Sequence, residues 1–366
     1  MDLSAGFLTA QLRRPLLAWF QRQRRDLPWR NTRDPYHIWV SEIMLQQTQA
    51  ATVIPFFQRF LQTFPTVQAL AAADEQQVLR LWEGLGYYRR ARHLHQAARQ
   101  LAAANGEHLP DDPEVWRELP GIGRYTLGAI LSQAFDRRLP ILEANSIRVL
   151  CRLFAVRRSP KENEVQKLLW TYAEKILPRR QVGDFNQALM ELGALICTPT
   201  APACESCPIK AVCQARKLGI QEDLPVRSAS PKTETVNEVA VVVRRRSKVL
   251  VVQRQDEGRW ANMWEFPHDA LQPGESHEAA AARWLPAMTG IDADLGLELT
   301  TLTHTVTRYA ITLVCLEAAY RRGRFRPTHY QQGLWLEPSQ LAQLPLSSPQ
   351  RRLAKLVMAP VQTRLF

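Results

Sequence analysis

The stretch LPGIGRYTLGAIL, residues 119–131, decides the fold of the first part of the chain. Gly121 and Gly123 permit a tight turn between two helices, and a turn without side chains lets backbone N–H groups approach a phosphate. Two glycines alone more often mark an ordinary helical turn, but the flanking Pro120 and Tyr125 make this pattern more specific. The segment therefore predicts a helical hairpin that contacts a nucleic-acid backbone.

On both sides of the hairpin, apolar residues recur at helical spacing, for example over 67–85 and 164–177. We therefore expect an all-helical region over residues 1–220. The polar, proline-bearing stretch that follows predicts a linker over 221–237. Beyond it, β-branched runs flank a basic turn in EVAVVVRRRSKVLVVQR, and HEAAAARWLPAM is suited to a helix, so residues 238–366 are predicted to form an α+β domain.

Composition limits the kind of partner. The chain has 366 residues, enough for two domains, and its 47 Lys and Arg against 35 Asp and Glu give a formal charge of +12. This excess favours a polyanion, with nucleic acid the leading candidate, although many basic proteins bind none. No apolar run is long enough for a membrane helix and the first residues lack a secretory pattern, so we expect a cytoplasmic protein with no membrane partner.

Four of the six cysteines lie close together, as Cys197-x6-Cys204-x2-Cys207-x5-Cys213. Disulfide-stapled secreted folds spread their cysteines more evenly, so a metal site in a reducing compartment fits this spacing better. Zinc sites usually pair two short Cys-x2-4-Cys steps, whereas the loop 197–213 has one. Zinc stays an alternative to an iron–sulfur cluster on these residues.

A family resemblance rests on several segments together: LPWRNTRDPYHIWVSEIMLQQTQAATVIPFF (27–57), WEGLGYYRRARHLH (82–95), the hairpin, FNQALMELGALICT (185–198) and the cysteine loop. These resemble the adenine DNA glycosylases, helix-hairpin-helix enzymes related to endonuclease III. The resemblance implies one four-iron four-sulfur cluster on the four cysteines. It also implies a monomer, associated with the nucleoid, that removes adenine opposite 8-oxoguanine or guanine in double-stranded DNA during base excision repair.

Glu42 is the first candidate catalytic residue. Its helix is predicted to begin with Asp34 as cap and Pro35 at the first position. Among apolar neighbours such as Trp39 and Ile43, a buried carboxyl would have a raised pKa. A lone helix glutamate is more often solvated, but the resemblance places the family's general acid in SEIMLQQT and assigns Glu42 to protonating adenine at N7.

The second candidate is Glu143 in ILEANSIRVL, because a cationic sugar needs a nearby carboxylate. The resemblance implies Asp, Gly and Asn here. This chain has Glu143 and Ala144 and keeps only Asn145. A carboxylate displaced by one methylene can cost about a hundredfold in rate, unless the turn around Ala144 is rearranged to compensate.

Tyr125 stands where the endonuclease III pattern has a lysine that attacks the sugar as an amine. A tyrosine there implies a glycosylase that does not cleave the strand. The resemblance further implies DNA-binding roles for two sets of residues. Gln47 and Tyr87 would wedge into the base stack, while Arg25, Trp29 and Leu45 would line the pocket for a flipped adenine. Without the family resemblance, Tyr87 and Trp29 would be assigned to core packing.

The C-terminal domain resembles a degenerate Nudix fold. Glu275 and Arg283 of the Nudix pattern are present, but the expected carboxylate positions hold Trp284, Ala287 and Met288. We therefore expect no nucleotide hydrolysis and no nucleotide cofactor. The resemblance implies that this domain instead recognises the lesion.

For that recognition the family uses a Phe-Ser-His loop, where this chain has Val306-Thr307-Arg308. Thr307 can donate or accept, and Arg308 offers several donors to the C8 oxygen of 8-oxoguanine. An exposed strand-end arginine is nearly as plausible for Arg308. The departures at this loop and at Glu143 leave two other functions open: a glycosylase with shifted mismatch preference, or a lesion-binding protein that has lost catalysis.

Overall fold

The computed structural model describes residues 9–106, 108–226, 233–306 and 308–359. The chain divides into two compact units. Unit 1 comprises the described residues of Met1–Ala72 and Gln96–Ala229, and unit 2 comprises those of Ala73–His95 and Ser230–Phe366. Within the described ranges, no helix combines the length and the apolar character that a membrane crossing requires.

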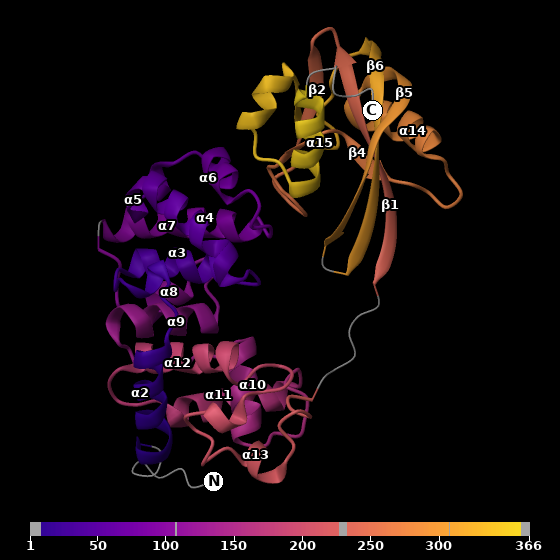
Figure 1. Cartoon of the computed structure of the whole chain (residues 1–366). Coiled ribbons are helices and arrows are strands. Elements are labelled where there is room, and N and C mark those ends of the chain that lie inside the picture. Colours follow the sequence, from indigo (N-terminus) through magenta and orange to yellow (C-terminus); the bar gives the residue numbers. More distant parts are fainter. Residues whose placement is uncertain (1–8, 107, 227–232, 307, 360–366) are drawn as a thin grey trace. The chain divides into compact units, whose positions relative to one another are not determined.

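Helices make up unit 1 (Figure 1). The predicted helical character of this region is confirmed for the described residues, whereas its extent as one domain, 1–220, stays a prediction, because residues 73–95 group with unit 2. The elements before the hairpin are η1 (Thr9–Arg13), α2 (Arg14–Gln23), η2 (Pro28–Arg30), α3 (Pro35–Leu45), α4 (Ala50–Thr63), α5 (Val67–Ala72) and the second part of α7 (Arg89–Asn105). They are followed by α8 (Pro113–Arg117), α9 (Arg124–Phe135), α10 (Ala144–Leu153), α11 (Asn163–Ile176), α12 (Val182–Leu195), η3 (Cys204–Ser206) and α13 (Gln214–Leu218).

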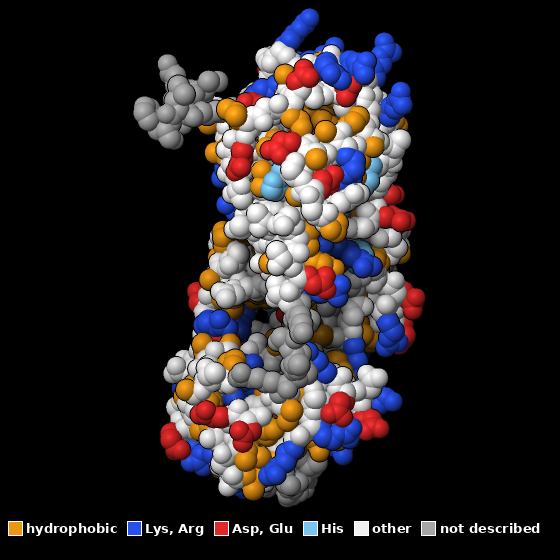
Figure 2. Space-filling model, turned by 90° about the vertical axis from the view of Figure 1, so that its right-hand side faces the viewer, with side chains coloured by type: hydrophobic (Ala, Val, Ile, Leu, Met, Phe, Trp, Pro, Cys, Tyr) orange, Lys and Arg blue, Asp and Glu red, His pale blue; other side chains and the backbone are white. Residues whose placement is uncertain are grey.

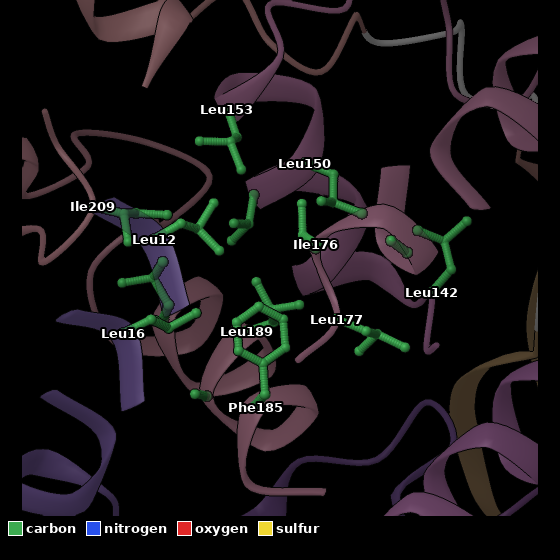
Figure 3. Close-up of a cluster of buried hydrophobic side chains, with 14 of the residues drawn as sticks. Leu12, Leu16, Leu142, Leu150, Leu153, Ile176, Leu177, Phe185, Leu189 and Ile209 are labelled. Atoms are coloured by element: carbon green, nitrogen blue, oxygen red, sulfur yellow. The ribbon is translucent and has the colours of Figure 1, made fainter. Parts of the chain in front are cut away.

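A hydrophobic core joins α2, α10, α11 and α12 in unit 1. Leucine and isoleucine side chains from these helices meet around Phe185, as the close-up in Figure 3 shows. Phe185 and Leu189 lie one helical turn apart on α12 and are both buried, as expected for one face of an amphipathic helix. This core fixes α12 against α10, and these two helices carry residues of the site described below.

Helix α3 begins where the sequence predicts. The Asp34 side chain accepts a hydrogen bond from the Tyr36 backbone N–H, and Pro35 occupies the first turn. Residues 38–44 of this helix are all buried. Glu42 therefore lies on a helix that is surrounded by other helices rather than by water.

The hairpin is formed by α8, a tight turn and α9. Gly121 adopts φ +82°, a left-handed conformation that favours glycine. Gly123 is the N-cap of α9 and offers no side chain to the first-turn N–H groups. Both glycines are exposed. The start of α9 is therefore accessible to solvent, as the predicted phosphate contact requires.

Unit 2 contains a seven-stranded mixed sheet in its described residues. The strand order is β3-β2-β1-β6-β5, with β4 also paired to β1 and β7 to β2. Its strands are β1 (Glu234–Arg245), β2 (Lys248–Arg254), β3 (Trp264–Glu265), β4 (His268–Ala270), β5 (Ile291–Val306), β6 (Tyr309–Gly323) and β7 (Tyr330–Leu336). The other elements are α6 (Glu75–Trp82), the start of α7, α14 (His277–Thr289), η4 (Pro338–Gln343) and α15 (Ser348–Met358).

Both faces of this sheet are covered. Val239, Val241 and Val243 of β1 belong to one core cluster, together with Trp284 of α14. The alternate residues Ala240 and Val242 belong to a second cluster, to which α15 contributes. A strand whose side chains alternate between two cores has a continuous run of apolar residues. The sheet with helices on both faces confirms the predicted α+β domain.

The predicted end of the linker at residue 237 is wrong. Strand β1 begins at Glu234, because residues 234–237 pair in parallel with residues 309–312 of β6. The side chains of this first part of the strand are polar and mostly exposed. Backbone pairing with β6 therefore determines the structure here, and composition alone did not reveal it.

Candidate active site

A cleft of about 450 Å³ lies in unit 1 between α3, α9, α10 and α12. Its lining includes seven of the residues predicted from the sequence: Arg25, Trp29, Glu42, Leu45, Tyr125, Glu143 and Asn145. These residues are separated by up to about 120 positions in the sequence, and the helical packing brings them together. The cleft therefore combines the two candidate carboxylates with the predicted base-binding residues.

Glu42 is buried in this cleft, with 4% of its surface exposed. One carboxyl oxygen accepts from the Tyr125 hydroxyl at 2.7 Å and the other from the Gln133 amide at 2.8 Å. Burial raises the pKa of Glu42 and the nearby Glu143 charge adds to this, while the two hydrogen bonds act in the opposite direction. The raised pKa expected from its apolar neighbours is confirmed.

Glu143 is held in a different way. It is the N-cap of α10, and its carboxylate accepts from the backbone N–H groups of Asn145 at 2.8 Å and Ser146 at 2.7 Å. The Glu143 backbone N–H donates in return to the Ser146 hydroxyl oxygen at 2.8 Å, which completes a capping box. The same hydroxyl donates to the Glu143 carbonyl at 3.0 Å. The longer side chain thus folds back onto its own helix start.

Asn145 connects this cap to the helix behind it. Its side-chain amide donates to Glu143 at 3.1 Å, and its oxygen accepts from Arg148 at 2.8 Å. Gly193 of α12 lies directly against it, since a Cβ atom there would stand 2.6 Å from the Asn145 Cβ. The close approach of α12 to α10 therefore fixes the position of Asn145.

Glu191 of α12 is a cleft residue that the sequence analysis did not select. It is fully buried and accepts hydrogen bonds from both Arg25 and Arg30, at distances from 2.6 to 3.0 Å. Burial alone would raise the pKa of Glu191, but these charged donors outweigh it and lower the pKa to about 2. The one signal in the sequence was an isolated glutamate in the apolar run ALMELGAL.

This ion pair with the buried Glu191 determines how Arg25 is placed in the cleft. The side chain is 42% exposed at the edge of the cleft, with its guanidinium oriented by Glu191. Arg30, which the sequence analysis also missed, is almost fully buried beside it. Trp29 packs edge-on against Phe57 at 5.5 Å between ring centroids, so one face of the cleft is apolar and one is charged.

The two predicted wedge residues share an unusual backbone. Gln47 has φ +57° and Tyr87 has φ +46°, values that are uncommon for residues other than glycine and that recur at functional sites. Both side chains are exposed. Gln47 follows α3 in unit 1, whereas Tyr87 belongs to unit 2. Each side chain is exposed on the surface of its own unit, where a binding partner can reach it.

The four cysteines of the loop 197–213 carry free thiols. Burial, together with the three other nearby cysteines, raises the pKa of Cys207 to about 12. The buried Arg152 donates to the Cys197 sulfur at 3.3 Å. In the described residues, no three Cys, His, Asp or Glu side chains converge closely enough to hold one metal ion. Four thiols in one loop match the donor set of an iron–sulfur cluster and also that of a zinc ion.

In unit 2, the remnant of the Nudix pattern is occupied by a salt bridge. Arg283 donates to both oxygens of Glu275, at 2.8 and 2.9 Å. Trp284 is buried at 1% exposure in the core under the sheet. A residue at this position therefore serves packing, and the expected lack of nucleotide hydrolysis remains a prediction.

The predicted lesion loop connects β5 to β6. Thr307 lies outside the described residues. Arg308 is exposed, forms an ion pair with Glu234 at 3.2 Å and donates to the Tyr309 hydroxyl at 3.0 Å. The exposed strand-end arginine considered from the sequence matches this placement, and a role in reading the lesion would require Arg308 to leave Glu234.

Two family models match the chain. Residues 40–175 match the HhH-GPD superfamily of base excision DNA repair proteins, and residues 238–356 match the NUDIX domain. The first range contains both carboxylates of the cleft and the hairpin. The second covers the sheet of unit 2 with α14 and most of α15.

Relatives and solved structures agree with these matches. The chain is 37% identical to the adenine DNA glycosylase of Mus musculus over 363 residues, covering 83% of this chain and 70% of the relative. A thermostable thymine-DNA glycosylase superposes with a TM-score of 0.52 at 30% identity, covering 58% of this chain and 96% of that structure. A trapped endonuclease III–DNA covalent intermediate superposes with a TM-score of 0.50 at 20% identity, covering 60% and 100%, which supports the fold alone.

Proposed function

The chain belongs to the adenine DNA glycosylase family, and on that premise we propose that it removes adenine paired with 8-oxoguanine or guanine in DNA. The enzyme hydrolyses N-glycosyl bonds. The observation that carries the proposal is the pair of carboxyl groups in one cleft, Glu42 desolvated and Glu143 held by N–H donors. Two carboxyl groups in contrasting environments suit the acid and the charge stabiliser of glycosidic cleavage.

Glu42 is proposed to protonate the leaving base. Its raised pKa keeps a proton on the carboxyl at a pH where an exposed glutamate has lost it. Tyr125 and Gln133 hold the two oxygens in place, so the group is oriented before the substrate arrives. A base that leaves as a neutral species needs such a positioned acid.

Glu143 is proposed to stabilise the positive charge that develops on the sugar. Its carboxylate is fixed by the two backbone N–H groups and by Asn145. A fixed charge needs no reorganisation when the transition state forms. The catalytic contribution therefore depends on the cap of α10 as much as on the carboxylate itself.

The reaction is proposed to stop at the abasic site. Of the described residues that line the cleft, none is a lysine, and Tyr125 donates its hydroxyl to Glu42 instead. Strand cleavage through a Schiff base requires an amine nucleophile. The product should keep an intact backbone until alkali or heat is applied, and efficient trapping of a protein–DNA adduct by borohydride would contradict this.

We propose one four-iron four-sulfur cluster on Cys197, Cys204, Cys207 and Cys213. The gathered free thiols and the Arg152 donor at Cys197 support this ligand set. The cluster would supply structural cross-linking of the loop. Protein purified without oxygen should contain about four irons per chain, and stoichiometric zinc would reject the proposal.

The protein is proposed to act as a monomer on double-stranded DNA. The test of the function is a set of single-turnover assays on duplexes that carry adenine opposite 8-oxoguanine, guanine or thymine. Uracil and thymine glycol serve as outgroup substrates. Adenine release, fastest opposite 8-oxoguanine, is expected.

A second candidate, a glycosylase with shifted mismatch preference, is favoured by one observation. Arg308 pairs with Glu234 and stands where the family has histidine. Equal rates opposite 8-oxoguanine and guanine would support it. Release of no base from any duplex would instead indicate a lesion-binding protein.

A further inference from the structure

Two arginine-rich turns meet at one end of the sheet in unit 2. The first joins β1 to β2 and carries Arg244, Arg245, Arg246 and Lys248. The second ends β6 and continues beyond it, with four arginines over residues 321–326. Strands β1 and β6 are parallel, and Arg244 pairs with Ala319, so both turns leave the sheet at the same end. We call the cationic residues of these turns the basic end.

The basic end has more positive charge than its neighbours neutralise. Arg244 pairs with Glu317, and Arg321 and Arg322 share Asp292, with Asp294 also near Arg321. Among the described residues, five exposed cations of this end form no ion pair: Arg245, Arg246, Lys248, Arg324 and Arg326. Ser247 of the first turn also donates to Glu337 at 2.8 Å, so eight cations against four acids leave an excess of four positive charges (8 − 4). Figure 2 shows Lys and Arg side chains projecting at the upper end of the molecule.

One of these arginines is held in place by aromatic rings. The Arg245 guanidinium lies 4.7 Å from the ring centroid of Tyr320 and 5.8 Å from that of Trp335. The two rings pack edge-on at 5.5 Å. A guanidinium that stacks on an aromatic face keeps its positive charge, and the N–H groups at its edge stay available to an acceptor. The surface is thus partly ordered before any partner binds.

The basic end is remote from the loop that was predicted to read the lesion. That loop lies at the start of β6, and the basic end follows the end of this 15-residue strand. At about 3.3 Å per residue the two ends are on the order of 45 Å apart. One base pair cannot contact both, so the basic end needs a partner that extends further or a separate one.

We propose that the basic end binds the phosphate backbone of duplex DNA without reading its sequence, as a second DNA contact of this protein. The proposal rests on the proposed function only in that DNA is the polyanion on which the protein acts. Unpaired cations on two exposed turns suit a partner with regularly repeated charge, and the arginine fork matches the oxygen atoms of phosphates. A small anion would instead need a closed site of converging donors.

The test uses the full chain and an undamaged duplex of mixed sequence. The variant combines Arg246→Ala, Lys248→Ala and Arg324→Ala, which are exposed and outside the catalytic cleft. At 0.15 M salt we expect its affinity for the duplex to fall about tenfold, and the slope of log K against log salt to decrease by about 2 to 3. Single-turnover base release at saturating protein should not change.

A matched control removes three exposed lysines from unit 1 instead: Lys161→Ala, Lys167→Ala and Lys175→Ala. A second variant, Arg246→Lys with Arg324→Lys, keeps the charge and should keep most of the affinity. Equal loss in the lysine control would reduce the effect to net charge and overturn the proposal. An unchanged slope in the first variant would also overturn it and leave an acidic protein as the partner. Failure of base release in the native protein would affect the proposed function but not this binding measurement.

Discussion

Two acidic side chains are buried and hydrogen-bonded in the cleft of unit 1, whereas charged side chains are exposed at the β5–β6 turn of unit 2. In the cleft, Glu42 and Glu191 are at most 4% exposed and each accepts hydrogen bonds on both carboxyl oxygens. At the turn, Arg308 and Glu234 form an ion pair in which both side chains are more than half exposed. The carboxyl groups of the cleft are held in position before substrate binds, and the charged groups of the turn are not.

This difference has an electrostatic meaning. A charge inside the protein interacts several times more strongly with its neighbours than one in water, and salt screens it less. An exposed ion pair contributes about 0–1 kcal/mol. Substitutions in the cleft should therefore have large effects on rate and stability, and substitutions at the turn should have small effects that depend on salt.

The largest effect is expected for Glu42→Gln. The amide keeps the shape and the contacts to Tyr125 but cannot donate the proton to the leaving base, so base release should fall by about a thousandfold. Binding to the mismatched duplex should be retained. In the native enzyme, release should decline as pH rises through the raised pKa of Glu42. A normal single-turnover rate in the variant would remove Glu42 from the mechanism.

The next effect concerns stability. Glu191→Gln leaves Arg25 and Arg30 without their buried counter-charge, and we expect the free energy of unfolding to fall by about 2–3 kcal/mol. Because the folded pKa of Glu191 is lowered to about 2, this stabilisation is present above its unfolded pKa and is lost as pH falls from about 4.5 towards 2. Denaturant unfolding at pH 7 and pH 3 measures both. The difference between native and variant should shrink at pH 3, and a constant difference would contradict the pairing.

Glu143→Gln should have a smaller effect, a fall in base release of at least about tenfold, or roughly 1.4 kcal/mol in barrier height. The amide can still cap α10 but carries no charge. Glu162→Gln, at the N-cap position of α11, is a matched control that should leave the rate unchanged. If Glu143→Asp proved faster than the native enzyme, the longer side chain would be a handicap that the capping box does not fully correct.

The smallest effect is expected at the turn. Arg308→Ala should reduce the preference for adenine opposite 8-oxoguanine over adenine opposite guanine by a few-fold, measured as a ratio of Kd values. Glu234→Ala releases Arg308 from its partner and should change the ratio in the opposite direction. Equal weakening on both duplexes would assign Arg308 to phosphate contact, and no weakening would leave it without a role in recognition.

The parts of the structure that could be predicted from sequence depend on local patterns. Asp34 and Pro35 marked the start of α3, and the apolar residues around Glu42 indicated its burial. The capping box of Glu143 with Ser146 also has a local signal, an acidic residue three positions before a hydroxyl.

The missed features depend on contacts between distant residues. Glu191 meets Arg25 across 166 positions, and no pattern near either residue reveals the other. Strand β1 begins inside a stretch of linker-like composition because β6 pairs with it. In both cases the deciding partner is brought in by the fold, so composition and periodicity carry no information about it.

The place where β1 joins the sheet also has a mechanical consequence. β1 is an interior strand, bonded to β2 and β4 on one side and to β6 on the other. A pull on the chain before Glu234 acts along the strand and loads many of these hydrogen bonds at once, as in shear. A force applied across the strand would instead open the bonds one after another. The attachment point of unit 2 is therefore among the parts of this unit that resist extension most strongly.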